Sequence, residues 1–249
     1  RHFGYTCYDE VHHLGATSFQ ITASIGYGRR RGLSATHERE DGMSPLFYHH
    51  IGPVIYESGE HDVIPETFFK QTGVVLPLST LVTLKDRTGE TSMAKLYQWL
   101  ATHVGRNDML EDTIREAIQE GRQVLALSDV VEHLEDMHRR FPGSGLIHGK
   151  IKGEVRQGIL NTGNLVFATT KLAQEGLDRK DLDTVFILLP ISSESRLRQI
   201  LGRIQRAHDG KLQTIAIIFE DEQVKQCRNM CLKLRNHLAA IGYPYKDSI

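Results

Sequence analysis

Two adjacent acidic residues, Asp9 and Glu10, directly follow a short strand-like run at residues 4–8. Ligands of parallel α/β sheets collect where the strands end, so this pair would lie at a binding edge. There, one carboxylate can hold a magnesium ion and the other can polarise the water that attacks a terminal phosphate. Asp-Glu pairs are also common on solvated loops, so the chemistry has to be judged together with the other motifs of the chain.

Three further motifs follow in order along the chain. Residues 34–36 read Ser-Ala-Thr, and residues 175–178 read Glu-Gly-Leu-Asp shortly after an apolar run. Residues 199–206 open a helix and fit the pattern Q-x-x-G-R-x-x-R. Positions three and four apart share a helix face, so the pattern predicts Gln199, Arg203 and Arg206 on one face. Two guanidinium groups on such a face can neutralise charge that develops on a transferred phosphate.

Residues 9–12 read Asp-Glu-Val-His, which is a DExH box. With the other motifs it gives the order and approximate spacing of superfamily 2 helicases, which the sequence resembles over nearly its whole length. Within that superfamily, residues 39–41 and 167–178 resemble the branch of UvsW- and XPB-like helicases, which includes phage members. His37 departs from the pattern, because many relatives have proline there. The resemblance implies an ATP-dependent DNA helicase or branch-processing translocase of DNA repair and recombination.

The resemblance also implies ATP and Mg²⁺ as nucleotide and metal, with Asp9 and Glu10 serving the metal and the attacking water. Gln199 would orient that water or an arginine. The residues expected to act in hydrolysis are Asp9, Glu10, His12, Gln199, Arg203 and Arg206, and those expected to bind ATP are Gly176, Asp178, Arg203 and Arg206.

Other residues are expected to contact the nucleic-acid strand or to couple it to the nucleotide site. The coupling residues that the resemblance implies are Ser34, Ala35 and Thr36, with His12. The expected nucleic-acid contacts are Thr169, Ser128, His148 and Arg39. Hydroxyl contacts to phosphate position a strand without reading its sequence. Ser128 and His148 could instead be loop residues whose polar groups are satisfied locally. The three arginines at residues 29–31 could also reach a nucleic-acid backbone, but we expect them to form a solvated approach to a strand.

A nucleotide motor also needs a phosphate-binding loop of the form G-x-x-x-x-G-K-S/T, and these 249 residues contain none. The nearest run, residues 143–151, is one residue too long, and Ile151 cannot bind magnesium. In the helicases this loop precedes the DExH box. We therefore expect an upstream RecA-like domain with that loop as a partner, in the same chain or a second one, and an inactive chain without it. Since the first methionine is Met43, we do not expect Arg1 to be a natural start.

Two alternatives remain open. In the first, the chain is a non-catalytic module of a split or decayed helicase that binds nucleic acid or a protein partner. Otherwise it would belong to an RNA helicase or to the motor subunit of a restriction enzyme. Such motifs contact phosphate and backbone rather than bases, so they do not separate DNA from RNA.

Composition limits the class of protein and the kind of nucleic-acid contact that the chain can make. The 249 residues hold 30 basic and 31 acidic side chains, so a nucleic-acid contact must come from a local surface rather than from global charge. The hydrophobic share of 40% is that of a globular protein. We expect no membrane segment, and a cytoplasmic, nuclear or nucleoid location rather than secretion. The three cysteines, Cys7, Cys227 and Cys231, are expected to be reduced thiols.

Short apolar runs that alternate with helices predict an α/β fold, with parallel sheets covered on both faces. We expect residues 1–50 to be the end of a first RecA-like domain, 51–105 a connector or insertion, and 106–249 a complete second one. Expected strands are 4–8, 31–34, 51–57, 73–84, 124–127, 145–147, 165–168, 185–189 and 215–219. Expected helices are 91–104, a helix capped by Asn107 and stopped at Gly121, 131–141, and 224–241.

Overall fold

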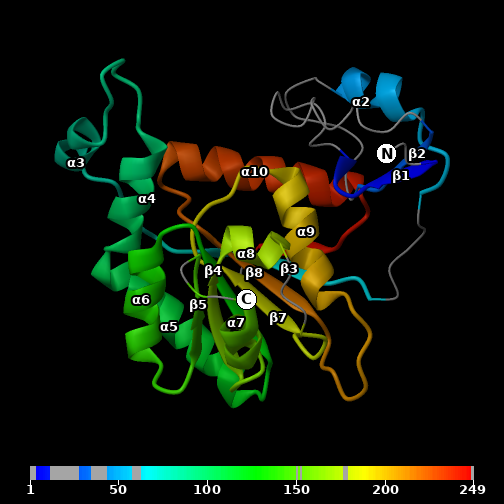
Figure 1. Ribbon diagram of the computed structural model, residues 1–249. Coiled ribbons are helices and arrows are strands. Elements are labelled where there is room, and N and C mark those ends of the chain that lie inside the picture. Colours follow the sequence, from blue (N-terminus) through cyan, green and yellow to red (C-terminus); the bar gives the residue numbers. More distant parts are fainter. Residues whose placement is uncertain are drawn as a thin grey trace. The chain divides into compact units, whose positions relative to one another are not determined.

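The computed structural model describes residues 4–11, 28–34, 44–57, 63–149, 151, 153–175 and 179–247 (Figure 1). The chain forms two compact units, Arg1–Glu60 and His61–Ile249. This division differs from the expected boundary at residue 106. The reason is strand β3 (Glu66–Gln71), which pairs with a strand formed by residues 215–220 and so belongs to the sheet of the second unit.

The first unit contains strands β1 (Tyr5–Tyr8) and β2 (Arg29–Gly32), which pair in parallel, and helix α2 (Ser44–Ile51). The strand expected at 4–8 is confirmed, and β2 lies two residues before its expected position. The strand expected at 51–57 does not form, because residue 51 ends α2 and residues 52–57 belong to no helix or strand. Val11 packs with Tyr8 at the centre of this unit.

Within the described residues, the second unit holds a seven-stranded sheet with the order β5-β6-β4-β7-β8-β3-β9. Every pair in it is parallel. Its strands are β3, β4 (Val124–Ser128), β5 (Gly145–Ile147), β6 (Leu165–Thr169), β7 (Thr184–Ile187), β8 (Ile215–Glu220) and β9 (Tyr245–Asp247). The strands expected at 124–127, 145–147, 165–168, 185–189 and 215–219 are confirmed, with β7 ending two residues early.

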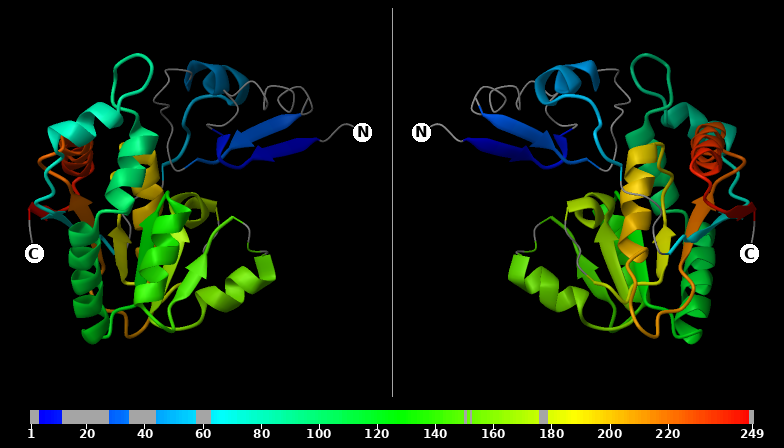
Figure 2. Two further views of the ribbon diagram at one scale, coloured as in Figure 1. Left: turned by 90° about the vertical axis from the view of Figure 1, so that its left-hand side faces the viewer. Right: turned by 90° about the vertical axis from the view of Figure 1, so that its right-hand side faces the viewer.

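Helices cover both faces of this sheet (Figure 2). They are α3 (Leu78–Thr83), α4 (Met93–Ala101), α5 (Val104–Gln119), α6 (Val131–Arg140), α7 (Gly153–Leu160), α8 (Thr170–Glu175), α9 (Glu194–Ile204) and α10 (Lys225–Ala240). Along β4, Val124 and Ala126 join the core under α5 and α6, whereas Leu125 and Leu127 join the core under α9 and α10. A strand that is buried on both faces needs such a continuous apolar run, so the expected α/β fold is found.

Two local expectations are wrong. Residues 73–84 do not form a strand, because the chain turns into α3 after Pro77 while the strand lies earlier, where Thr67 and Phe69 are buried in alternation. Asn107 does not cap a helix. It lies inside α5, whose cap is His103, which accepts a hydrogen bond from the backbone of Arg106 at 3.1 Å.

The three cysteines form no disulfide, and Cys227 and Cys231 are buried on α10. Burial raises the pKa of the Cys227 thiol to about 12, so this thiol is protonated and unreactive at neutral pH. Over the described part of the chain, no helix is both long and apolar enough to cross a membrane.

Candidate nucleotide and nucleic-acid sites

The acidic turn of the first unit follows β1 directly. The backbone N–H of Leu33 donates to the carbonyl of Tyr8 at 2.8 Å, and that of Val11 donates to the carbonyl of Leu33 at 2.9 Å. These bonds join the turn at Asp9 and Glu10 to the segment that leads into Ser34. The first unit therefore brings the start of the DExH box and the start of the Ser-Ala-Thr motif to one edge. The other predicted residues of these segments, His12, Ala35, Thr36 and Arg39, lie outside the described residues.

Glycine at position 32 permits this arrangement. A Cβ atom at Gly32 would lie 2.8 Å from both Cγ atoms of Val11, closer than carbon atoms approach without displacement. Val11 is buried, so it packs against the bare backbone of β2. The residue after Glu10 is thus held against the neighbouring strand.

The turn at Asp9 and Glu10 has a constrained backbone. The N–H of Glu10 donates to Oδ1 of Asp9 at 2.9 Å, which orients that carboxylate. Glu10 has a φ of 48°, a left-handed conformation that costs a non-glycine residue roughly 1–2 kcal/mol. Such strain is common where function fixes the backbone. The described residues contain no group of three or more His, Cys, Asp or Glu that could hold a metal.

In the second unit, three predicted residues meet at the carboxyl edge of the sheet. Ser128 of β4 is the register partner of Thr169 of β6. Ile147 of β5 pairs with Ala168, so His148 continues from β5 next to Thr169. Residues 20 or more positions apart in sequence are therefore neighbours at the edge where parallel sheets bind ligands.

Their side chains differ in accessibility. Thr169 and His148 are half-buried, and no hydrogen bond from either side chain to another described residue is found. Ser128 is buried. Its Oγ lies 3.2 Å from Nδ1 of His133 and accepts from the N–H of Val130 at 3.2 Å. The hydroxyl of Ser128 is thus satisfied inside the protein, whereas Thr169 and His148 can meet a ligand.

His133 extends this internal network. Its Nε2 lies 3.1 Å from Oδ1 of Asn107, and Nδ2 of Asn107 donates to the carbonyl of Ala101 at 2.8 Å. Since Oδ1 can only accept, Nε2 of His133 carries the proton and Nδ1 accepts from Ser128. Burial, followed by the charge of Arg106, lowers the pKa of His133 to about 3. A neutral histidine therefore holds the turn after β4. His133 was not predicted, because in the sequence it is one of several polar residues on a helix with few apolar positions.

Helix α9 carries the arginine motif. Ser193 caps it by accepting from the N–H of Arg196 at 3.3 Å. The buried face consists of Leu197, Ile200, Leu201 and Ile204. Gln199 and Arg203 lie one turn apart beside that face and are partly exposed, as the pattern predicts. The prediction is wrong for Arg206, because α9 ends at Ile204 and Gln205 is its C-cap, so Arg206 lies in the following loop.

Of the Glu-Gly-Leu-Asp motif at residues 175–178, only Glu175 is among the described residues, and it ends α8. Helix α8 begins directly after Thr169 and packs against α9. Gly176 and Asp178, which follow α8, lie outside the described residues.

Other arginines have internal partners. The guanidinium of Arg196 pairs with the carboxylate of Asp129 at 2.9 Å. In the first unit, Nη1 of Arg30 lies 3.0 Å from Nδ1 of His50. This contact fits a local role of the arginine run rather than a contact to a nucleic-acid backbone.

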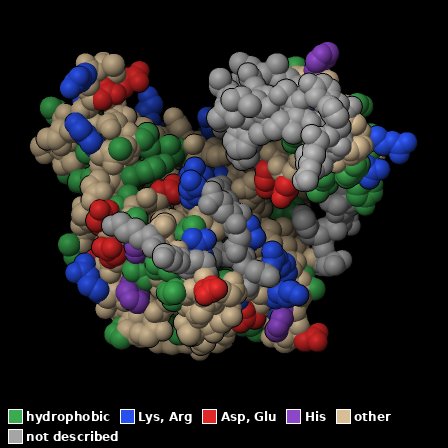
Figure 3. All heavy atoms as spheres, in the orientation of Figure 1, with side chains coloured by type: hydrophobic (Ala, Val, Ile, Leu, Met, Phe, Trp, Pro, Cys, Tyr) green, Lys and Arg blue, Asp and Glu red, His purple; other side chains and the backbone are tan. Residues whose placement is uncertain are grey.

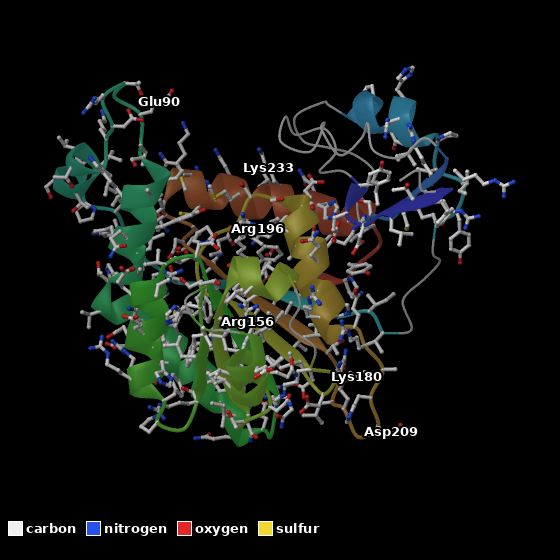
Figure 4. The ribbon with its side chains drawn as sticks, viewed as in Figure 1. Glu90, Arg156, Lys180, Arg196, Asp209 and Lys233 are labelled. Atoms are coloured by element: carbon white, nitrogen blue, oxygen red, sulfur yellow. The ribbon has the colours of Figure 1, made fainter. Side chains whose placement is uncertain are left out.

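Lys and Arg side chains gather on the face of the second unit that presents α8 and α9 (Figure 3). Figure 4 labels three of them: Arg156 on α7, Arg196 on α9 and Lys180 in the segment after α8. The net charge of −1 therefore conceals a locally basic face, which is the kind of surface that attracts phosphate.

The protein family described as helicase conserved C-terminal domain matches residues 105–208. The second unit has the fold of a helicase C-terminal domain. The match covers α5 through the loop after α9, and so includes Ser128, His148, Thr169 and the arginine motif. β3 and α3–α4 precede it, although β3 lies within the same sheet.

Curated relatives extend over more of the chain. A protein of Acanthamoeba polyphaga mimivirus named as an ATP-dependent RNA helicase is 25% identical over 214 residues, covering 82% of this chain and 40% of its own. The DNA 3'-5' helicase XPB of Kineococcus radiotolerans is 25% identical over 259 residues, covering 99% of this chain and 44% of its own. The chain thus spans less than half the length of these relatives.

Solved structures share the fold. A fragment of an HsdR subunit of a type I restriction enzyme from Vibrio vulnificus has a TM-score of 0.67 at 17% identity and covers 98% of this chain and 48% of its own. T4 UvsW has a TM-score of 0.55 at 16% identity and covers 99% of this chain and 53% of its own. At these identities the similarities show the fold of the chain.

Proposed function

We propose that the chain is part of an ATP-dependent DNA helicase or translocase of the DExH type, related to the XPB- and UvsW-like branch. The observation that carries the proposal is the register of β4, β5 and β6, which places Thr169 and His148 side by side at the carboxyl edge. This edge lies within the part of the chain that matches the helicase C-terminal domain. Half-buried polar side chains that form no hydrogen bond to another described residue are suited to phosphate and sugar contacts.

The residues divide the work between binding and hydrolysis. Thr169 and His148 bind the nucleic-acid backbone, and Ser128 shapes the adjacent turn. Asp9 would hold Mg²⁺, which would supply stabilisation of the phosphate charge, and Glu10 would orient the attacking water. Arg203 and Arg206 neutralise charge on the γ-phosphate, and Gln199 orients one of these groups. The phosphate-binding loop comes from a segment that is not among these 249 residues.

RNA is the second candidate substrate. One curated relative is named as an RNA helicase, and contacts to phosphate alone do not distinguish the two sugars. We favour DNA because the XPB relative aligns along nearly the whole chain.

Hydrolysis is tested in the full-length protein that contains this chain. We expect ATP turnover that nucleic acid stimulates, and its loss in Arg203→Ala, with DNA stimulating more than RNA of the same sequence. Lys246→Ala is the control, because Lys246 pairs with Glu66 at the edge strand β9 rather than with any motif. Retained turnover in Arg203→Ala would remove the arginine assignment, and stronger stimulation by RNA would reverse the substrate choice.

Binding is tested on the 249-residue chain itself, by titrating labelled single-stranded DNA. Binding by the chain combined with no hydrolysis by the full-length protein would favour a non-catalytic module.

A further inference from the structure

The loop that follows α9 carries Arg206 and is held by a lysine that no motif includes. Nζ of Lys211 donates to the carbonyl of Ile204 at 2.7 Å, to that of Arg206 at 2.8 Å and to that of Lys180 at 3.3 Å. An ammonium group has three N–H donors and no acceptor, so all three donors are used on backbone carbonyls. The contacts join the end of the arginine helix to the segment two residues after Asp178. Figure 4 labels Lys180 and Asp209, which mark these two segments.

One of the three carbonyls that Lys211 meets, that of Ile204, belongs to the last turn of α9. The last carbonyls of a helix have no partner within it, and a cation near that end also interacts favourably with the helix dipole. Ile204 is the last residue of α9, and Arg206 lies two residues beyond. With one ammonium group, Lys211 therefore binds the last carbonyl of the helix and the backbone carbonyl of Arg206.

The third contact of Lys211, the carbonyl of Lys180, lies next to a residue that is held by hydrogen bonds. The neighbouring Arg179 is buried, and its Nη1 donates to the carbonyls of Leu160 and Gly163, each at 2.9 Å. Lys180 is thus tied to the end of α7 and to the turn before β6. The lysine connects the arginine loop to a fixed part of the domain rather than to another loose segment.

The charges around Lys211 and a hydrogen bond to the neighbouring Gln205 also bear on how the arginine loop is held. The pKa of Lys211 is lowered, mainly by burial; the carboxylates of Asp183 and Asp181 oppose this shift, and the charge of Arg206 adds to it. On the other side, Nε2 of Gln205 donates to the hydroxyl of Tyr243 at 2.6 Å. The residue before Arg206 is therefore also held, by the turn that follows α10.

We propose that Lys211 is a positioning residue that holds Arg206 where it meets the γ-phosphate, with Tyr243 bracing the adjacent Gln205. This proposal rests on the proposed function, since Lys211 acts only through Arg206. A misplacement of about 1 Å at a catalytic group can cost on the order of 100-fold in rate.

The test measures nucleic-acid-stimulated ATP hydrolysis by the full-length protein. We expect Lys211→Met to lower kcat by about tenfold to 100-fold with little change in the KM for ATP. Lys211→Met combined with Arg206→Ala should be no slower than Arg206→Ala alone, because the lysine has nothing left to position. Tyr243→Phe removes one hydroxyl and keeps the ring, so it gives a milder loss of kcat in a protein that folds even if Lys211→Met does not.

Lys95→Met is the matched control. Nζ of Lys95 also donates to two backbone carbonyls, those of Thr83 and Lys85, but it lies on α4, away from the arginine loop. It should leave kcat unchanged.

The outcomes separate the two proposals. A wild-type protein with no stimulated turnover would overturn the proposed function and this role together. An active wild-type protein that loses turnover in Arg206→Ala but retains it in Lys211→Met and Tyr243→Phe would overturn the positioning role alone. Equal losses in Lys211→Met and Lys95→Met, or additive losses in the double variant, would show a general effect on the fold and would also overturn it.

Discussion

Nε2 of His133 donates to Oδ1 of Asn107 across 3.1 Å, in the interior of the domain that carries the arginine motif. The other ring nitrogen meets Ser128, the register partner of Thr169. A histidine that is held neutral by burial thus supports the edge proposed to bind nucleic acid.

This histidine gives stability a defined pH dependence. The pKa of His133 is about 3 in the folded chain and about 6.5 when unfolded. Above pH 6.5 neither state is protonated, and below it the unfolded state gains a proton that the folded state does not. The free energy of unfolding therefore falls as pH falls from 6.5 towards 3, by up to about 1.4 kcal/mol per pH unit.

His133→Gln removes this titration, so the stability difference between wild type and variant should narrow by about 1 kcal/mol between pH 5.5 and 4.5. Urea unfolding at each pH provides the measurement, and carboxylates that titrate in both proteins cancel in the difference. A constant difference across this range would mean that His133 is protonated in the folded chain.

The ion pair between Arg106 and Asp221 is fully buried. Nε of Arg106 donates to Oδ1 of Asp221 at 2.7 Å, and Thr72 donates to the same oxygen at 2.7 Å. Replacing one partner leaves a buried charge uncompensated, so Arg106→Met should cost about 3–5 kcal/mol of unfolding free energy. Denaturant unfolding measures the change.

Arg139→Met is the control for that prediction. Arg139 pairs with Asp136 at 3.0 Å, but its side chain is 75% exposed. Its loss should stay within about 1 kcal/mol. Similar losses in the two variants would contradict the role assigned to burial.

Gly145 at the start of β5 has no room for a side chain. A Cβ there would lie 2.8 Å from Cγ2 of Ile159 and 3.2 Å from the carbonyl oxygen of the same residue. Gly145→Ala should therefore destabilise the domain by about 1–3 kcal/mol. Gly158→Ala in α7 meets nothing within 4 Å and should be neutral or stabilising by up to about 1 kcal/mol. Thermal unfolding of both variants measures the two changes in stability, and equal melting temperatures would contradict the predicted clash.

Binding should depend on Thr169 more than on Ser128. Thr169→Val removes a hydroxyl that has no recorded partner among the described residues, so affinity for single-stranded DNA should fall about fivefold regardless of base sequence. Ser128→Ala breaks the bond to His133 and should lower stability while affinity stays within about twofold. Fluorescence anisotropy at one fixed salt concentration measures both. The reverse order of the two effects would move the contact from Thr169 to Ser128.

Local sequence predicted much of the second unit. The apolar runs that became β4 to β8 are continuous because a strand covered on both faces has no polar side, and a pattern of that kind is visible residue by residue. Gln199 and Arg203 were placed correctly one turn apart, since helical spacing is also local. Arg206 was misplaced because α9 ends at Ile204, where the chain meets a contact from Lys211, seven residues further on, that helical spacing does not reveal.

What only the tertiary structure decided are the contacts between distant segments. β3 joins the sheet by pairing with β8, some 150 residues away, so its short run gave no sign of its place and the domain boundary was set too late. Nothing in sequence brings together Ser128, His133 and Asn107, or Lys211 and Lys180. Their partners are fixed by strand register and helix packing. The sequence determined which chemistry the chain can carry, and the fold decided which of those side chains are turned inward and which are left to meet a ligand.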